Sequence, residues 1–183
     1  MLSELRADFD RHGRSVKSLG FWLVALYRFG RYSYELPGPF GSASSKLYGA
    51  LIRAEELFLG SVVERNTQIG EGLVLMHAHG IRIAPRAVLG QRVRIAHGVT
   101  IGTGMGRPGV PVIGDDVVIG AGSSILGPVK VGNGARIEPN TLVVGDVPEG
   151  AVVSGVPARV VRRTQNGSSI SRGEEPARRE EAS

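Results

Sequence analysis

A period of six residues runs through the middle of this chain and restricts its fold more than any other feature. Counting in sixes from Ile83 to Val143 gives an aliphatic side chain at every position except Arg107. The series is Ile83, Leu89, Ile95, Ile101, Arg107, Ile113, Ile119, Ile125, Val131, Ile137 and Val143. Glycine follows many of these aliphatics, and a small or β-branched residue stands four positions further on. A fixed repeat of this kind indicates a parallel β-helix, in which stacked coils share one continuous core.

The repeat predicts a coil of three short strands, each with one aliphatic side chain pointing inward. Glycine then follows where the chain must turn a corner at little steric cost. An amphipathic helix does not fit, because six-residue steps do not keep to one face at 3.6 residues per turn. So many glycines would also cost a helix about 1 kcal/mol each. We therefore expect a mainly β fold, with a β-helix over residues 62–163.

The residues on either side of the repeat have a different composition and a different spacing of apolar residues. Residues 1–61 lack the regular glycines and carry apolar residues at helical steps of three and four. These residues are Leu19, Trp22, Leu26 and Phe29, followed by Leu47, Leu51, Ala54 and Leu57. We expect two helices, separated by the Pro/Gly segment 36–41, that cap the domain. The alternative is a membrane-surface role for Phe21 and Trp22, flanked by Arg28 and Arg31. Residues 164–183 are polar and of mixed charge, and we expect a disordered tail.

Composition restricts the cellular compartment and the binding partners that we expect for this protein. The chain has no cysteine, which excludes disulfides, thiolate metal sites and cysteine nucleophiles. Its 22 basic and 17 acidic residues are interleaved and aromatics are scarce, so nucleic-acid binding is not expected. The first residues include acids and no apolar signal core, and the apolar run 20–27 is far shorter than the roughly 20 residues that span a bilayer. We expect a cytoplasmic protein without a transmembrane segment.

Two breaks in the repeat are the expected places for chemistry, because solenoids carry function on loops that leave the coil. From Leu75 to Ile83 the step is eight rather than six, so two residues are inserted within 76–80, Met-His-Ala-His-Gly. The second break is Arg107, in a glycine-rich stretch over 102–109 that replaces one hexad. We expect this stretch to form a loop.

Three of the four histidines fall at or near the first break. His97 lies 18 residues after His79 and 20 after His77, so it should stack one coil beyond one of this pair. Imidazole is the side chain best suited to take a proton from a hydroxyl near neutral pH. The grouping favours His77 as a general base, with His97 in a supporting or merely stacking role. His12 stands in a polar segment and is expected to be solvated.

A metal site is the other chemistry that a histidine cluster offers. The gamma-class carbonic anhydrases resemble this chain in the repeat. Their two ligand histidines stand five residues apart in a late coil, and that spacing has no counterpart here. We therefore expect no metal.

Residues 62–161 resemble the serine acetyltransferase branch of the hexapeptide acyltransferases. Segment 75–81, LMHAHGI, is similar to the segment that carries that family's catalytic histidine, and 98–104, GVTIGTG, is similar to its cofactor loop. Segments 119–127 and 154–159 match the later coils and the end of the domain. The resemblance implies a left-handed β-helix and a homotrimer whose trimers can pair. It also implies acetyl-CoA as the donor substrate, held in the groove between subunits.

The resemblance implies a role for each matching residue. His77 would deprotonate the acceptor hydroxyl, with His79 as a second catalytic candidate and Glu64 as a group that orients His77. His97 and Arg107 would contact the acceptor. Contacts to acetyl-CoA would come from the loop, a later coil and two arginines that can meet phosphates or remain solvated. These residues are Gly102, Thr103, Gly104, Ala121, Gly122, Arg159 and Arg162.

Departures from the family pattern bear on the acceptor. Met76 and Val62 stand where serine acetyltransferases have aspartates, and a further family histidine falls near 110–111, Val-Pro. Serine carries an ammonium that needs carboxylate partners in a partly buried site. The pattern looks closer to colanic-acid-type polysaccharide acetyltransferases, which share a segment like 96–102, AHGVTIG. We expect acetyl transfer to a hydroxyl of a sugar, glycan precursor or similar metabolite. The alternatives are serine O-acetylation and a non-catalytic or metal-binding solenoid.

Overall fold

The structure, a computed structural model, describes residues 2–35, 38–104 and 106–163. Three helices come first, α1 (Leu2–Arg11), α2 (Leu19–Glu35) and α3 (Gly38–Leu59). Strands of two to five residues follow: β1 (Val62–Val63), β2 (Gln68–Ile69), β3 (Val74–Leu75), β4 (Arg82–Ile83), β5 (Val88–Leu89), β6 (Arg94–Ile95), β7 (Thr100–Gly102), β8 (Val112–Ile113), β9 (Val118–Ile119), β10 (Ser124–Leu126), β11 (Lys130–Val131), β12 (Arg136–Ile137), β13 (Leu142–Val143), β14 (Ala151–Ser154) and β15 (Arg159–Arg163).

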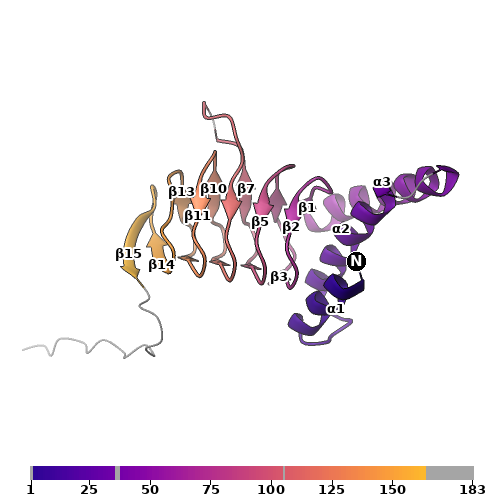
Figure 1. Cartoon of the computed structure of the whole chain (residues 1–183), viewed down its shortest axis with the longest axis horizontal. Helices are drawn as coiled ribbons and strands as arrows, with labels where there is room; N and C mark the ends of the chain where they lie inside the picture. Colours follow the sequence, from indigo (N-terminus) through magenta and orange to yellow (C-terminus); the bar gives the residue numbers. More distant parts are fainter. Residues whose placement is uncertain (1, 36–37, 105, 164–183) are drawn as a thin grey trace, which may run out of the picture.

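The strands form three sheets, which are the faces of a triangular prism. Figure 1 shows the coils of this prism stacked along its axis. Sheet A has the order β1-β4-β7-β10-β13, and sheet B has the order β2-β5-β8-β11. Sheet C runs β3-β6-β9-β12-β14 and ends on β15, which pairs antiparallel to β14. All other pairings within the sheets are parallel, since each coil adds one strand to each sheet. The expected left-handed parallel β-helix with an N-terminal helical region is confirmed.

The core of the prism consists of the aliphatic side chains of the six-residue series. All ten are buried: Ile83, Leu89, Ile95, Ile101, Ile113, Ile119, Ile125, Val131, Ile137 and Val143. The residue four positions after most of these aliphatics is also buried, as Val93, Val99 and Val117 illustrate. Arg107, the exception in the series, is exposed on a loop. The repeat therefore predicts the core correctly, residue by residue.

The glycines that follow the inward aliphatics have a different role from the expected one. Gly114 and Gly120 do not have the positive φ that would require glycine at a corner. Instead, a Cβ on Gly120 would lie 2.5 Å from the backbone nitrogen of Pro139 in the next coil. A Cβ on Gly114 would lie 2.9 Å from the nitrogen of Asn133. These glycines allow the close approach of successive coils, whereas positive φ occurs at other corner positions such as Gly98 (69°).

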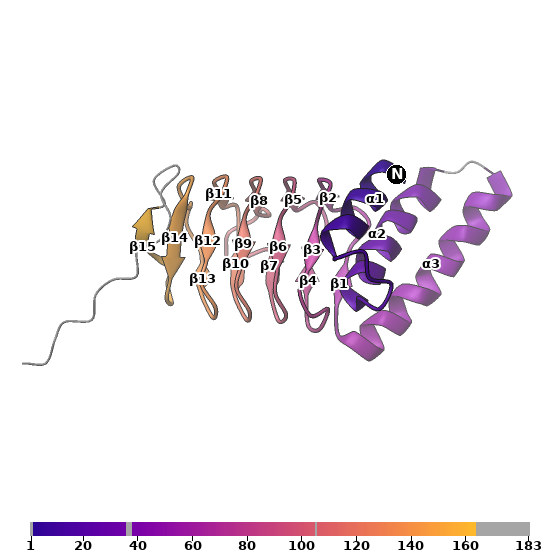
Figure 2. The ribbon, with the colours of Figure 1, turned by 90° about the horizontal axis from the view of Figure 1, so that it is seen from below.

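The helices cover the open end of the first coil, as Figure 2 shows from below. Helix α2 buries Leu23, Val24 and Tyr27 in the core, one residue away from the predicted face. The predicted residues Leu19 and Trp22 are 52% and 55% exposed. The covering matters because strands β1–β3 have no preceding coil to pair with, and an uncovered sheet edge invites pairing with another chain.

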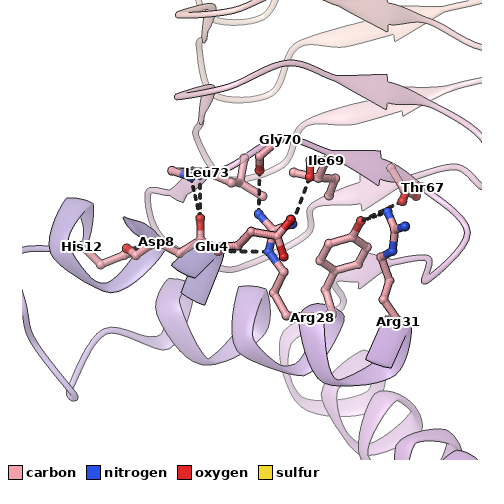
Figure 3. A network of polar contacts seen from close by, with 11 residues as sticks. Glu4, Asp8, His12, Arg28, Arg31, Thr67, Ile69, Gly70 and Leu73 are labelled. Carbon is pink, nitrogen blue, oxygen red and sulfur yellow. Dashed lines mark hydrogen bonds and ion pairs between the residues drawn. The ribbon is translucent and has the colours of Figure 1, made fainter. Parts of the chain in front are cut away.

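A polar network fixes this cap to the first coil, and Figure 3 shows it at close range. Arg28 is 3% exposed, and its Nε donates to the Asp8 carboxylate at 3.1 Å. The two side chains also bind backbone groups of the coil: Arg28 donates to the carbonyls of Ile69 and Gly70, and Asp8 accepts from the amides of Gly72 and Leu73. Phe21 and Arg28 are buried here, so these two residues are not available for the membrane-surface role that the sequence left open.

The outer helix α3 leaves its predicted apolar face uncovered in the single chain. Leu47, Leu51 and Leu57 are 54%, 44% and 81% exposed. Among the described residues, none of the helices has the length and apolarity needed to cross a bilayer. The expected disordered tail, residues 164–183, lies outside the described residues.

Candidate active site

The first break in the repeat lies at the corner between β3 and β4, where the chain passes from sheet C to sheet A. Leu75 pairs with Ile95, which is 20 residues later, whereas Ile83 pairs with Ile101, which is 18 residues later. The two extra residues are therefore accommodated between 76 and 81. We call the column of turns from sheet C to sheet A the C–A corner, and the column of turns from sheet A to sheet B the A–B corner.

The inserted turn presents two histidines outward. His77 has φ = 59°, a left-handed conformation that is uncommon for any residue except glycine. Its carbonyl accepts the backbone N–H of His79 at 2.8 Å, which closes a three-residue turn. Ala78, between them, is 1% exposed, while both histidine side chains are exposed. Ordinary turns of this chain have the same conformation, as at Arg86, Arg92 and Asn140, so the φ of His77 indicates a tight turn and is not by itself a sign of function.

A buried serine braces this turn. The Ser61 hydroxyl, fully buried, donates to the Ala78 carbonyl at 2.9 Å and accepts the Ile81 amide at 3.0 Å. The Leu59 carbonyl accepts the Gly80 amide at 3.0 Å. Our sequence reasoning missed Ser61. The signal for it is a hydroxyl residue in the inward column of small and β-branched residues, where a buried polar group needs partners.

The strand that leads into the turn is held from the other side by His12. The Leu75 amide donates to Nε2 of His12 at 3.2 Å, so this nitrogen is the acceptor. Nδ1 therefore carries the proton and donates to the Asp8 carbonyl at 2.7 Å. His12 was expected to be solvated, and that expectation is wrong. The cause is α1, a helix that the apolar spacing did not predict.

His97 packs beside His77 rather than beside His79. The ring centroids of His77 and His97 are 5.9 Å apart, with the planes at 82° in an edge-to-face arrangement. The backbone register differs, because the Gly98 amide donates to the His79 carbonyl at 2.9 Å. The sequence left open which histidine of the pair His97 joins, and the inserted turn decides it. Three imidazoles thus share the C–A corner.

A pocket of about 280 Å³ opens beside these histidines. The start of α2 and the inserted turn form its walls: Lys17, Ser18, Leu19, Gly20, Leu75, His77, Ala78 and His79. Lys17 is the one lysine among these described lining residues, and none of them carries a carboxylate. The candidate base therefore lies in a small pocket whose formal charge is positive.

The second break forms a loop that leaves the prism between β7 and β8, as expected, and it stands out in Figure 1. Gly104 and Arg107 form an antiparallel bridge within it, and Nη1 of Arg107 donates to the Val144 carbonyl at 2.7 Å. A hollow of about 300 Å³ lies at the base of the loop on the outer face of sheet A. Its walls are Val62, Glu64, Arg82, Ile83, Ala84, Pro85, Thr100, Ile101, Gly102, Thr103 and Leu126.

The predicted site residues thus divide between two edges of sheet A. His77, His79 and His97 lie at the C–A corner, while the loop and Glu64 lie at the A–B corner. Within one chain Glu64 lines the hollow by the loop and not the pocket of His77. An orienting role of Glu64 toward His77 would therefore need a second subunit.

The remaining candidates follow the length of the prism. The Gly122 amide donates to the His97 carbonyl at 2.9 Å, so Ala121 and Gly122 form the next turn of the C–A corner. Arg159 and Arg162 are exposed on β15 at the far end. Among the described residues, no three His, Cys, Asp or Glu side chains come close enough together to hold a metal ion.

Known proteins with similar sequences are hexapeptide-repeat transferases. Residues 111–145 match the family model described as bacterial transferase hexapeptide (six repeats). A serine acetyltransferase of Mycobacterium tuberculosis is 42% identical over 111 residues, which make up 60% of this chain and 48% of that protein. A serine acetyltransferase of Synechococcus elongatus is 30% identical over 174 residues, which make up 90% of this chain and 68% of that protein.

A solved structure extends the similarity to the fold. The crystal structure of a Brucella abortus serine acetyltransferase in complex with coenzyme A is similar to this chain with a TM-score of 0.74 and 28% identity. The match covers 88% of this chain and 66% of that one. Against the Mycobacterium tuberculosis protein, the chain spans about half of the relative's length.

Proposed function

The chain belongs to the serine acetyltransferase family, and from that premise we propose that it transfers the acetyl group of acetyl-CoA to the hydroxyl of serine. The observation that carries the proposal is His77: an exposed imidazole in a left-handed backbone conformation, at the break in the repeat, beside a small pocket. Imidazole is the usual general base for a hydroxyl nucleophile near neutral pH.

The proposed reaction follows from the position of this base. His77 takes the proton of the acceptor hydroxyl as the oxygen attacks the thioester carbonyl, and a tetrahedral intermediate forms. The C–S bond then breaks, the acetyl group stays on the acceptor oxygen, and His77 passes the proton to the CoA thiolate. Edge-on packing by His97 limits how far the His77 ring can turn, which keeps it oriented toward the pocket.

The division of the site between two corners supports an oligomer. Donor contacts predicted at Thr103 and Gly104 lie at the A–B corner, across sheet A from His77. We propose that, in a homotrimer, the C–A corner of one subunit faces the A–B corner of the next. Acetyl-CoA would then lie in the groove between them, along Ala121 and Gly122. Arg159 and Arg162 remain the proposed phosphate contacts.

Serine replaces the sugar acceptor that the sequence alone led us to expect. The relatives described above are serine acetyltransferases, so the expected closeness to colanic-acid-type enzymes, and with it a role in polysaccharide biosynthesis, is not supported. The sequence favoured a sugar because Met76 and Val62 stand where the family has aspartates. Their presence does not show which other groups of the pocket bind serine.

A thiol-release assay tests the proposal. Purified protein is given acetyl-CoA with serine, or with a panel of sugars and sugar nucleotides, and free CoA is followed over time. We expect release that depends on serine and on an intact His77, with O-acetylserine found by mass spectrometry. Release with a sugar but not with serine would contradict the proposal.

A further inference from the structure

The pocket beside His77 contains a cation and lacks an anion, and this bears on which part of the acceptor it binds. We propose that Lys17 binds the acceptor's carboxylate and that the pocket does not select for an ammonium group. The acceptor class is then small hydroxy carboxylates, of which serine is one. This inference rests on the proposed function and names the group that gives it specificity.

The geometry places Lys17 at the pocket with little freedom in its backbone. Its own amide donates to the Ser15 hydroxyl at 3.3 Å, and the Val16 carbonyl accepts the indole N–H of Trp22 at 2.8 Å. The Ser18 hydroxyl accepts the Phe21 amide at 3.3 Å and so caps α2, and its own O–H can still donate to a ligand. Among the side chains that line this wall, Lys17 is the one that carries a formal positive charge.

The wall itself is fixed relative to the base. Gly20 touches the backbone of Leu75 so closely that an added Cβ would overlap the Leu75 carbonyl oxygen. His12 accepts the Leu75 amide from the same side. Leu75 stands two residues before His77, so the start of α2 packs directly against the strand that leads to the base. Lys17 and His77 line the same pocket, and the flexible stem of the lysine lets its ammonium reach a ligand there.

Charge then decides which end of serine this pocket recognises. None of the ion pairs among the described residues involves Lys17. An ammonium beside a carboxylate forms a charge-assisted hydrogen bond, which is among the stronger polar contacts in proteins. No lining carboxylate is available for the acceptor's own ammonium, since Met76 stands next to the base. A hydroxy acid without an amino group should bind here as well as serine does.

The size of the pocket agrees with a small acceptor. Its volume of about 280 Å³ is just below the range usual for drug-sized ligands, about 300–1,000 Å³. A serine-sized molecule fits with the acetyl donor adjacent, whereas a glycan chain would have to lie outside. Size and charge therefore point to the same class.

The test uses the full-length protein and four acceptors: serine, glycerate, serinamide and glucose. Glycerate keeps the carboxylate and hydroxyl of serine without the amino group, and serinamide keeps the amino group without the carboxylate. We expect serine and glycerate to have kcat/KM values within about tenfold of each other. Serinamide should be lower by about 100-fold, because the lysine then has no partner.

Variants of Lys17 provide the second half of the test. Lys17→Gln should raise KM for serine and for glycerate by about tenfold or more, with kcat and the KM for acetyl-CoA nearly unchanged. Lys17→Arg should restore most of the affinity, since the charge returns. Lys46→Gln, on the exposed surface of α3, is the matched control and should leave all constants as in the parent. Equal melting temperatures exclude misfolding.

The possible results show whether this inference or the proposed function has failed. Turnover of serine that is unaffected by Lys17→Gln, or serinamide used as well as serine, overturns the inference and leaves the acetyltransferase activity standing. If serine is acetylated and glycerate is not, the pocket does select for an ammonium group, which overturns that part of the inference. A neighbouring subunit then supplies the carboxylate that binds the ammonium. No CoA release with any acceptor refutes the proposed function instead.

Discussion

The ring of His97 packs edge-on against the ring of His77, with the centroids 5.9 Å apart and the planes at 82°. The two histidines come from successive turns of the C–A corner, so the contact joins one coil to the next. In the backbone register His79 is the equivalent of His97, because the Gly98 amide donates to the His79 carbonyl. The ring contact is nevertheless made by His77, which lies in the turn that holds the two inserted residues.

Replacement of His77 by alanine should lower turnover by roughly 100- to 10,000-fold, because general-base catalysis contributes about this much. Acetyl-CoA binding, measured by calorimetry, should survive, since the predicted donor contacts lie in other turns. His79→Ala distinguishes the two histidines of the turn. If His79→Ala abolishes turnover while His77→Ala retains it, the roles that we assign within this turn are reversed.

Replacement of Ser61 by alanine should reduce both stability and turnover. The variant leaves the Ala78 carbonyl and the Ile81 amide without a partner inside the fold, which costs about 1–3 kcal/mol in the free energy of unfolding. Because these groups hold the turn of His77, kcat should fall as well, by about tenfold or more. Urea denaturation and steady-state kinetics measure the two effects.

Ser123→Ala is the matched control for this variant. The Ser123 hydroxyl makes the same pair of bonds three coils further on, to the Glu138 carbonyl and from the Thr141 amide. Its loss should lower stability by a similar amount, while kcat at saturating acetyl-CoA stays close to that of the parent. Equal losses of kcat in both serine variants would mean that Ser61 acts only through global stability.

The sequence predicts the prism well and its cap poorly, for a physical reason. The inward positions, such as Ile95 and Ile119, repeat in sequence because every coil places them in the same environment. The cap has no repeat, and its helices are packed by unique contacts. Helix α1 carries its buried carboxylate, Asp8, in a polar sequence, so hydropathy gives no sign that it docks.

The same distinction holds at the site. His77 and the loop at Arg107 were predictable because they interrupt a regular pattern. Ser61 continues the inward column of the pattern, and its role depends on two backbone groups of an inserted turn that sequence spacing does not place. Lys17 belongs to a non-repeating segment, and only the packing of Gly20 on Leu75 brings it to the pocket.

Replacement of Asp8 by alanine should strongly destabilise the protein. The change removes the buried carboxylate partner of the Arg28 guanidinium, which keeps the partly exposed Glu4 at 3.5 Å, and it removes the acceptor of the Gly72 and Leu73 amides. Breaking a buried ion pair from one side typically costs about 3–5 kcal/mol, and chemical denaturation measures this loss. Asp116→Ala breaks the exposed pair with Arg92 and is the control, for which we expect little change. Comparable losses in the two variants would contradict a structural role for the buried pair.

Glu55 is a partly buried residue on α3 with one covered carboxyl oxygen, and its charge opposes folding. Burial raises the pKa of Glu55 from 4.5 to about 7, and its Oε1 has no hydrogen-bond partner among the described residues. The hydroxyl of Tyr48, two turns earlier on the helix, is likewise buried and unpaired, and burial raises the pKa of Tyr48 to about 12. Between pH 4.5 and 7 the folded state binds the Glu55 proton more tightly than the unfolded state does. Stability therefore falls as pH rises through this window and levels off above it.

Glu55→Gln should remove this loss, because glutamine keeps the shape of the protonated acid without its charge. We expect the melting temperature of the variant to exceed that of the parent by about 2–4 °C at pH 8, with a smaller difference at pH 5. Glu56→Gln changes the adjacent, exposed carboxylate, which lies 3.8 Å from Arg82, and should show no gain that grows with pH. The contrary result is that the melting temperatures of Glu55→Gln and the parent differ by the same amount at pH 5 and pH 8. Glu55 would then already be ionised in the folded protein at pH 5, and this result would contradict a raised pKa of Glu55.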